Sequence, residues 1–374
     1  MAATTKRKVA KPKAAVKRRT TKTTAEVPAV VSATTVVRRK ILTKEKIEPN
    51  YFASSENHNL QFVSSGCCVL DNVLGGGYVL GRMANIVGDK SSGKTLLAIE
   101  ASANFIQRYK GGEVWYAEAE AAFDQSYAGA LGMPLNKVKF RDKIATVEDL
   151  FEDIELACKQ STKNKPILYI IDSMDALSSR TEMAQKIEEG SYNLNKQKKL
   201  GELFRRKIKE IESSNVGVII ISQIRDKIGV TFGETKFRAG GKALDFYASQ
   251  ILWLAEIQKL KKTIGGVERV IGISVKATCK KNKVGLPFRT CEFPLLFGFG
   301  IDDMTANTEW LISNNKEHRL KELGLSKAGY KIRIHALRNE GGEEMQLLRE
   351  ALNVAVGEEW TSIESSFLPK VRKY

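Results

Sequence analysis

Cysteine and histidine are scarce in this 374-residue chain and are poorly arranged for metal binding. The five cysteines contain no C-x-x-C pair and the three histidines are scattered, so we expect no zinc site and a reducing, intracellular compartment. No apolar run reaches transmembrane length and no signal-peptide core is evident, so we expect no membrane partner. No internal repeat is evident either. These absences argue against a zinc protein and against a membrane-spanning one.

Acidic residues are nearly absent from the first 44 positions. Residues 1–44 hold thirteen Lys and Arg and one acid, Glu26, so they carry +12 of the net charge of +17. Their other residues are mostly Ala, Thr, Val and Pro, which predicts a disordered basic tail. Four roles fit: a nucleic-acid arm, a nuclear address at 6–8 and 17–19, an organelle transit peptide, or a solubilising tail. We therefore expect a cytoplasmic, DNA-associated protein, with nucleus or organelle as alternatives.

A phosphate-binding loop, G-x-x-x-x-G-K-T, occupies residues 88–95. Its glycines allow successive backbone N–H groups to point at phosphate oxygens, and the following helix adds its positive dipole. Lys94 has the reach for the β- and γ-phosphates, and the Thr95 hydroxyl suits Mg²⁺. By itself the pattern predicts a nucleoside triphosphate and Mg²⁺ as ligands. The expected nucleotide contacts in this loop are Gly88, Asp89, Lys90, Ser91, Ser92, Gly93, Lys94, Thr95 and Leu96.

Apolar runs alternate with helical segments between about residues 60 and 300. Continuous apolar strands alternating with helices indicate an α/β fold, with a central, mostly parallel sheet flanked by helices. No clear helix separates the runs 251–254 and 270–275, so we expect that edge to be antiparallel. The predicted strands are 83–87, 114–117, 167–171, 216–221, 251–254 and 270–275, and the predicted helices are 147–160 and 196–212.

The same pattern divides the chain into four parts. After about residue 303 it becomes polar and helical, with 345–356 as the clearest helix. The expected organisation is a disordered basic tail (1–44), a linker or short oligomerisation segment (45–61), an α/β core (62–302) and a small C-terminal helical region (303–374).

Acidic residues follow two of the predicted strands. Asp172 ends the apolar strand 167–171, where a phosphate-loop enzyme needs a second anchor for its metal; it could instead cap a helix. Glu118 and Glu120 follow the strand 114–117, and a carboxylate there is placed to activate water. Composition alone does not choose between these two acids.

The segment after the strand 216–221 combines amides, cations and aromatic rings. Gln223 is placed to sense a γ-phosphate and to transmit its presence to the loop 224–241. Cations interleaved with aromatic rings suit single-stranded nucleic acid, although such a loop can also be a solvated surface. The basic run 280–283 is, by itself, typical of a solvated face.

Together these segments resemble the RecA family of recombinases. The resemblance covers about residues 62–302 and implies a RecA-type ATPase core. It implies that Glu120, not Glu118, activates water, and that Asp124 and Tyr127 contact adenine. It also implies that Lys281 and Lys283 reach the ATP of a neighbouring subunit. The segments that carry it are 74–77, 88–95, 117–124, 171–173, 223–233, 240–241, 246–249, 281–284 and 287–288.

The resemblance also implies two DNA-binding loops. The most specific stretch, 223–233, is similar to the family's second DNA loop with its wedge-like aromatic, here Phe232. The segment near 182–195 corresponds to the first loop. The DNA contacts expected from these two regions are Arg225, Lys227, Ile228, Gly229, Phe232, Lys236, Phe237, Arg238, Gly240 and Gly241, together with Tyr192 and Arg205.

Three departures from the family pattern stand out. Residues 45–61 are short and polar, with no evident counterpart of the N-terminal helix that ties family filaments together. Asp245 occupies a place where bacterial members usually have lysine. The chain ends in a basic segment, 370–373, instead of an acidic one, which predicts tighter nonspecific binding of DNA.

The expected function is a DNA-dependent ATPase that assembles as a helical homo-oligomer on single-stranded DNA and pairs it with double-stranded DNA. Two other functions remain compatible with the residues. One is a ring-shaped helicase or DNA motor of the same fold. The other is a largely non-catalytic DNA-coating protein in which the basic tail dominates.

Overall fold

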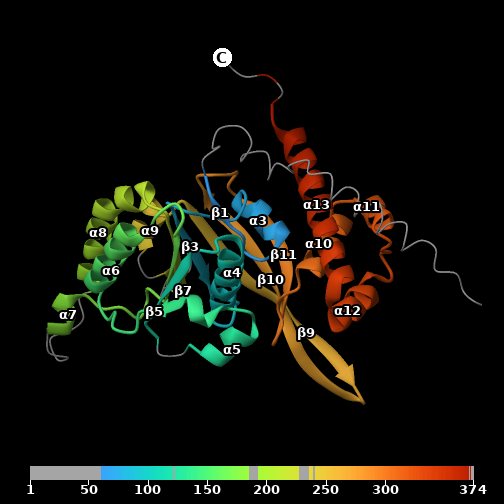
Figure 1. Cartoon of the computed structure of the whole chain (residues 1–374), viewed down its shortest axis with the longest axis horizontal. Coiled ribbons are helices and arrows are strands. Elements are labelled where there is room, and N and C mark those ends of the chain that lie inside the picture. Colours follow the sequence, from blue (N-terminus) through green and yellow to red (C-terminus); the bar gives the residue numbers. More distant parts are fainter. Residues whose placement is uncertain are drawn as a thin grey trace, which may run out of the picture.

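A computed structural model describes residues 60–120, 123–184, 193–226, 236–238, 241–369 and 371. The basic tail and nearly all of the linker lie outside these residues, and so do Tyr192, Lys227, Ile228, Gly229, Phe232 and Gly240. A ten-stranded sheet forms the centre of the molecule (Figure 1). A two-stranded antiparallel sheet, β1 (Phe62–Val63) and β2 (Tyr78–Val79), lies beside it.

The central sheet is parallel on one side and antiparallel on the other. Its order is β12-β11-β10-β9-β3-β7-β6-β4-β5, and β8 pairs with β7. Pairing is parallel from β5 through to β9 and antiparallel from β9 to β12, which confirms the predicted antiparallel edge. The strands are β3 (Met83–Gly88), β4 (Glu113–Glu118), β5 (Val138–Phe140), β6 (Ile167–Asp172), β7 (Val216–Asp226), β8 (Lys236–Arg238), β9 (Gln250–Ile264), β10 (Val267–Asn282), β11 (Arg289–Leu296) and β12 (Gly300–Ile301).

Helices cover both faces of the sheet, as continuous apolar strands require. Strand β6 shows why: Leu168 and Ile170 join one buried cluster, while Ile167, Tyr169 and Ile171 join the other. The first cluster includes α3 (Cys68–Leu74) and α4 (Lys94–Arg108); the second includes α6 (Val147–Gln160), α8 (Asn193–Ser213) and α9 (Gly241–Tyr247). The α/β fold class predicted from the sequence is confirmed.

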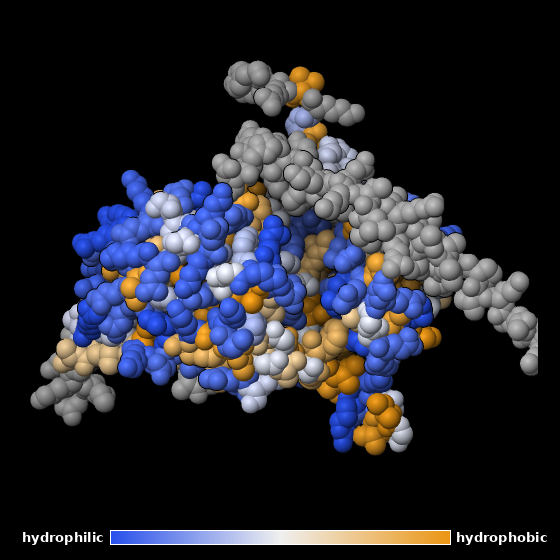
Figure 2. Space-filling view, in the orientation of Figure 1, coloured by the Kyte–Doolittle hydropathy of each residue, from blue (hydrophilic) through white to orange (hydrophobic). Residues whose placement is uncertain are grey.

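The strands β9 and β10 are far longer than the runs 251–254 and 270–275 that the sequence predicted. They form a ribbon that projects from the sheet and turns at Gly265 and Gly266, which both have positive φ (Figure 1). Side chains on the outer half of the ribbon are exposed, and Figure 2 shows hydrophobic and hydrophilic residues mixed at its tip. The predicted strands were too short because an exposed ribbon lacks the apolar run that marks a buried strand.

The C-terminal region is helical, as expected, but its last helix is much longer than the predicted 345–356. Hydrophobic residues of this region, including Leu311, Ile334 and Leu352, belong to the same buried cluster as α3 and α4. Arg289 of β11 also pairs with Glu364 through two hydrogen bonds of 2.8 and 2.6 Å. The helices are α10 (Asp303–Ser313), α11 (Glu317–Glu322), α12 (Tyr330–Glu340) and α13 (Gly342–Phe367).

Candidate nucleotide-binding site and DNA-facing elements

The phosphate loop connects the end of β3 to the start of α4. Gly93 precedes α4 with φ of 88°, a conformation that L-residues rarely adopt. An added Cβ at Gly88 would collide with Ser92 Oγ, and one at Gly93 would collide with Leu295. The loop is closed by Ser92 Oγ, which donates to the carbonyl of Asp89 at 2.8 Å. The geometry therefore requires both glycines and leaves the first turn of α4 facing the loop.

Lys94 folds back into the loop. Its Nζ donates to the carbonyl oxygen of Asp89 at 2.6 Å, and only 8% of the residue is exposed. Burial lowers the pKa of its ammonium, while the carboxylates of Asp172 and Asp89 act in the opposite direction. A bound phosphate would supply the full counter-charge that a carbonyl cannot.

Thr95 and Asp172 meet across the sheet, as the metal prediction requires. Thr95 Oγ1 donates to Asp172 Oδ2 at 2.8 Å, and Tyr116 Oη donates to the same oxygen at 2.8 Å. Burial raises the pKa of Asp172, and the two hydroxyl donors lower it only in part. A hydroxyl and a carboxylate are the protein ligands that Mg²⁺ takes beside a nucleotide, so this pair fits the metal.

Glu120 and Gln223 also meet, from neighbouring regions of the sheet edge. Gln223 Nε2 donates to Glu120 Oε1 at 2.7 Å, and Ser173 Oγ donates to the same oxygen. The backbone N–H of Gln223 is fixed by Asp175 Oδ2 at 2.8 Å. Glu118 accepts from the backbone N–H of Glu120 at 3.1 Å, so it orients the segment that carries the other acid. The contacts with Gln223 and Ser173 favour Glu120 as the acid of the site.

Asp124 and Tyr127 lie together at the start of α5 (Gln125–Ala130). Asp124 is the N-cap of this helix and accepts from the backbone N–H of Tyr127 at 3.0 Å. The Tyr127 residue is 38% exposed. Their contact with adenine remains a prediction.

The lysine pair at the end of β10 contacts α9. Lys281 Nζ donates to the carbonyl of Phe246 at 2.8 Å and to that of Asp245. Lys283 is exposed, and its backbone N–H donates to Ser249 at 2.9 Å. Their action on a neighbour's nucleotide remains a prediction.

The segment that the sequence predicts to be the second DNA-binding loop, over 224–241, begins and ends as paired antiparallel strands. Strand β7 continues to Asp226, and β8 returns beside it with Arg225 opposite Phe237 and Asp226 opposite Lys236. Gly241 begins α9 directly afterwards, and Arg238 ends β8. The sequence missed these strands because the apolar pattern stops at 221, where the strand leaves the covered part of the sheet.

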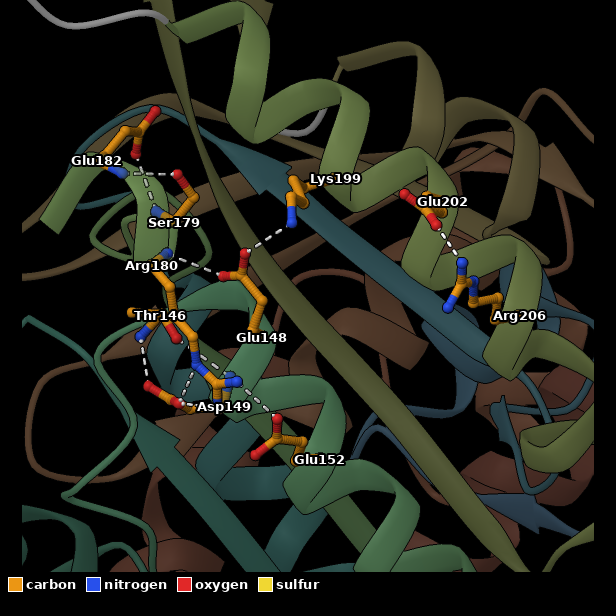
Figure 3. Close-up of polar contacts among 10 residues, drawn as sticks. All are labelled: Thr146, Glu148, Asp149, Glu152, Ser179, Arg180, Glu182, Lys199, Glu202 and Arg206. Atoms are coloured by element: carbon orange, nitrogen blue, oxygen red, sulfur yellow. Dashed lines mark hydrogen bonds and ion pairs between the residues drawn. The ribbon is translucent and has the colours of Figure 1, made fainter. Parts of the chain in front are cut away.

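An ionic network that the sequence did not predict flanks the first DNA segment (Figure 3). Arg180, at the start of α7 (Arg180–Ala184), pairs with Asp149 at 2.6 Å and with Glu152 at 2.8 Å on α6. Lys199 of α8 lies 3.5 Å from Glu148. Two S/T-x-x-D/E caps, Thr146 with Asp149 and Ser179 with Glu182, were the available signal. Arg205, the remaining predicted contact in this region, is exposed on α8.

Two polar residues that the sequence did not predict, Asn282 and Gln250, hold the backbone near Lys281 and Lys283 in place. The Asn282 side chain donates to the carbonyl of Leu74 at 3.0 Å and accepts from the N–H groups of Val284 and Gly285. Gln250 Nε2 donates to Leu74 and Gly77 at 2.7 and 2.8 Å. These bonds fix the end of β10 against the C-terminal end of α3.

Comparison with known proteins decides the family. Residues 39–302 match the family model described as the RecA N-terminal domain. The chain belongs to the RecA family. It is 38% identical over 246 residues to Protein RecA of Crocosphaera subtropica, and 39% identical over 246 residues to that of Rippkaea orientalis. Each alignment covers 66% of this chain and 67% of the relative.

A third relative, of lower identity, also supports membership of the RecA family, and its alignment is slightly longer. Protein RecA of Mycoplasma mycoides is 35% identical over 260 residues, which is 69% of this chain and 72% of the relative. The RecA family match includes the phosphate loop, the Glu120 and Asp172 strand ends and the β7–β8 hairpin. Residues 303–374 lie beyond the family model.

Proposed function

We propose that this RecA family member is a DNA-dependent ATPase that forms a filament on single-stranded DNA and promotes homologous pairing and strand exchange in recombination and repair. The observation that carries the proposal is the Glu120–Gln223 hydrogen bond. It joins a candidate water-activating acid to the strand that continues directly into the β7–β8 hairpin. Nucleotide chemistry and the DNA-facing element thus share one strand.

The phosphate loop and Lys94 bind and orient the phosphates of ATP. The Lys94 ammonium is held inside the loop by the carbonyl of Asp89, and a phosphate oxygen would replace that carbonyl as its partner. Thr95 and Asp172 hold Mg²⁺, which when bound neutralises charge that develops on the phosphate oxygens. Burial makes the ionised form of Asp172 unfavourable and so raises its pKa. A cation beside the carboxylate would offset this cost.

Glu120 orients the attacking water and accepts its proton. The Glu120 carboxylate accepts hydrogen bonds from Gln223 and Ser173. A γ-phosphate competes for the Gln223 amide, so occupancy of the site and the position of the β7 strand are linked. Lys281 and Lys283 complete the site from a neighbouring subunit, where added positive charge stabilises the transferring phosphoryl group.

Single-stranded DNA is the partner of the hairpin and of the first DNA segment, and double-stranded DNA is the second substrate. Basic and aromatic residues in these segments suit a strand whose backbone is tracked by charge and whose bases stack. No helix in the described part of the chain is long and apolar enough to cross a membrane. We place the protein with DNA, and among the described residues no contact favours the ring-motor or DNA-coating alternative.

The test is ATP turnover with and without single-stranded DNA. Replacing Glu120→Gln should lower DNA-stimulated turnover by about 10²- to 10⁴-fold, the usual contribution of a general base. Glu118→Gln is the matched control, because it removes one charge two residues away and should retain most of the rate. Equal losses in both variants, or an undiminished rate in Glu120→Gln, would contradict the assignment.

A further inference from the structure

Two hydroxyl groups hold the same oxygen of the Asp172 carboxylate. Thr95 Oγ1, from the start of α4, and Tyr116 Oη, from β4, each lie 2.8 Å from Asp172 Oδ2. An ionised carboxylate can only accept hydrogen bonds, so both hydroxyls donate. Thr95 already has a place in the candidate metal site. Tyr116 does not, although its bond to Asp172 is just as short.

The position of Tyr116 on its strand explains why its hydroxyl reaches this carboxylate. Strand β4 runs parallel to β6, and Tyr116 lies opposite Ile170, two residues before Asp172. Side chains alternate between the two faces of a sheet, so Tyr116, Ile170 and Asp172 share the face that α4 covers. The phenol of Tyr116 extends past Ile170 to the end of β6. A phenylalanine would fill the same space but would offer Asp172 no hydroxyl.

The ring of Tyr116 is fixed by its surroundings. The residue is 0% exposed. Its ring centroid lies 4.6 Å from that of Phe123 and 6.0 Å from that of Phe140, and the centroids of those two rings are 5.4 Å apart. Close packing restricts the rotamers of a buried ring, so the hydroxyl has little freedom to leave Asp172.

The bond from Tyr116 restrains Asp172 from outside the expected metal ligands. Thr95 is expected to bind Mg²⁺ through the same hydroxyl that donates to Asp172. Tyr116 instead approaches from a neighbouring strand, and its ring is anchored against Phe123 and not against the phosphate loop. Hydrogen-bonded partners of metal-binding side chains orient those side chains and contribute about 10- to 100-fold to metal affinity. Tyr116 has the geometry of such an outer partner.

We propose that Tyr116 is a positioning residue for the metal: its hydroxyl orients the Asp172 carboxylate so that Asp172 and Thr95 hold Mg²⁺ together. The residue acts through Asp172 and contacts neither metal nor nucleotide itself. Its effect is therefore confined to interactions that need the metal. This inference rests on the proposed function, because it assumes that Thr95 and Asp172 form the Mg²⁺ site.

The experiment is the binding of a fluorescent, non-hydrolysable ATP analogue to the full chain, measured with saturating Mg²⁺ and again with EDTA. The ratio of the two affinities reports the coupling between metal and nucleotide. Tyr116→Phe keeps the ring and removes only the hydroxyl. It should lower this ratio about tenfold, the lower end of the cost of losing such a partner, and leave the affinity in EDTA unchanged.

Tyr169→Phe is the matched control, with circular dichroism to confirm that both variants are folded. Tyr169 is also 0% exposed, and its hydroxyl donates to another carboxylate, Asp153 Oδ2, at 2.8 Å. It lies on β6, in the buried cluster on the opposite face of the sheet from α4. This variant should retain the native ratio. An unchanged ratio in Tyr116→Phe, an equal loss in Tyr169→Phe, or an equal loss of affinity in EDTA would each overturn the proposal.

Turnover provides a second measurement, because a positioning role can be compensated by more metal. With single-stranded DNA present, Tyr116→Phe should need about tenfold more Mg²⁺ for half-maximal ATP turnover, and turnover should recover as Mg²⁺ is raised. A loss that excess Mg²⁺ does not restore would mean that Tyr116 only supports the fold, and would overturn the proposal.

These outcomes are distinguishable from failure of the proposed function. Absence of DNA-stimulated turnover in the native chain, with the lowered ratio in Tyr116→Phe, would count against the proposed function alone. DNA-stimulated turnover in the native chain, with an unchanged ratio in Tyr116→Phe, would count against the positioning role alone. A native chain that binds the analogue equally well in Mg²⁺ and in EDTA would overturn the metal site and the positioning role together.

Discussion

The residues around the candidate water-activating acid are arranged to restrain it. Glu120 accepts hydrogen bonds from both Gln223 and Ser173. The backbone N–H of Gln223 donates to Asp175 Oδ2, which fixes the main chain from which the side-chain amide extends. At the scale of single residues, ATP would act through an exchange of partners, because a γ-phosphate oxygen can accept from the Gln223 amide that bonds Glu120.

Replacing Gln223→Ala should uncouple DNA from hydrolysis. The variant retains the phosphate loop and Glu120, so nucleotide binding should be unchanged, while the stimulation of turnover by single-stranded DNA falls by about 10- to 100-fold. The measurement is the ratio of turnover with and without DNA. Gln258→Ala, on the exposed part of β9, is the control, and undiminished stimulation in Gln223→Ala would remove Gln223 from the coupling.

Single residues differ in how far the sequence could predict them. Lys94, Thr95 and Asp172 follow from local spacing, because their partners are set by one loop and one strand end. Glu120 could not be separated from Glu118 by composition, since the distinction depends on Gln223, 103 positions away. Asn282 carried no sequence signal for the same reason: its partner is the carbonyl of Leu74.

At the scale of elements, α4 links the phosphate loop to the antiparallel edge of the sheet. Glu100, in the middle of this helix, accepts from the backbone N–H of Ile301 in β12 at 3.0 Å. Burial raises the pKa of Glu100 to about 7, and the bond from Ile301 opposes this only in part. The helix that carries Lys94 therefore has a titratable group at its contact with the sheet edge.

Glu100 should make stability depend on pH near neutrality. Because the folded-state pKa is raised, its contribution is present below about pH 4.5 and is lost as pH rises through about 7. Glu100→Gln should match the native chain at about pH 4 and exceed it by about 1–2 kcal/mol in free energy of unfolding at about pH 8. Denaturant titrations across this range check it, with Glu256→Gln, an exposed acid, as control. A constant difference at all pH values would contradict the prediction.

The β7–β8 hairpin should contribute to DNA affinity mainly through charge. Lys236→Ala with Arg238→Ala removes two cations from β8. The slope of log K against log salt for single-stranded DNA should then decrease by about 1.4, since each lost phosphate contact contributes about 0.7. Fluorescence anisotropy over a salt series measures the slope. Lys110→Ala with Lys137→Ala removes the same charge from exposed sites elsewhere, and an equal effect there would mean that net charge alone decides affinity.

Elements were predictable where both faces of a strand are buried. The helix 147–160 and the strand 167–171 are close to α6 and β6 because buried elements carry regular apolar patterns. The outer halves of β9 and β10 and the continuation of β7 to Asp226 were missed. These segments extend beyond the part of the sheet that helices cover. Each is held by pairing with its neighbouring strand, so it needs no continuous hydrophobic run.

At the scale of the whole molecule, charge is unevenly divided. Residues 1–44 carry +12 of the net +17, while the described residues from 60 onward include the ten-stranded sheet and the helices that cover it. The C-terminal helices share the buried cluster of α3 and α4, and Arg289 pairs with the largely buried Glu364. The sequence predicted a helical C-terminal region but could not reveal this shared packing, because the partners lie far apart in the chain.

Deleting residues 1–44 should weaken DNA binding without abolishing catalysis. The DNA affinity should fall and its salt slope should decrease by about 0.7 for each tail cation that contacts a phosphate. ATP turnover at saturating DNA should persist, because Lys94, Glu120 and Gln223 lie outside the deletion. Paired affinity and turnover measurements check this, and replacing the thirteen basic residues by glutamine at full length is the matched control. Loss of all ATP-responsive DNA binding would favour the DNA-coating alternative.

The turn at the tip of the β9–β10 ribbon provides a place to attach a label. Gly265 and Gly266 are exposed, and a Cβ added at either would meet no atom within 4 Å. An epitope inserted between them should leave the sheet and the nucleotide site undisturbed in a single subunit. On an assembled filament, an antibody would then recognise the epitope only where the ribbon faces outward. One insertion would thus report the orientation of every subunit along the DNA.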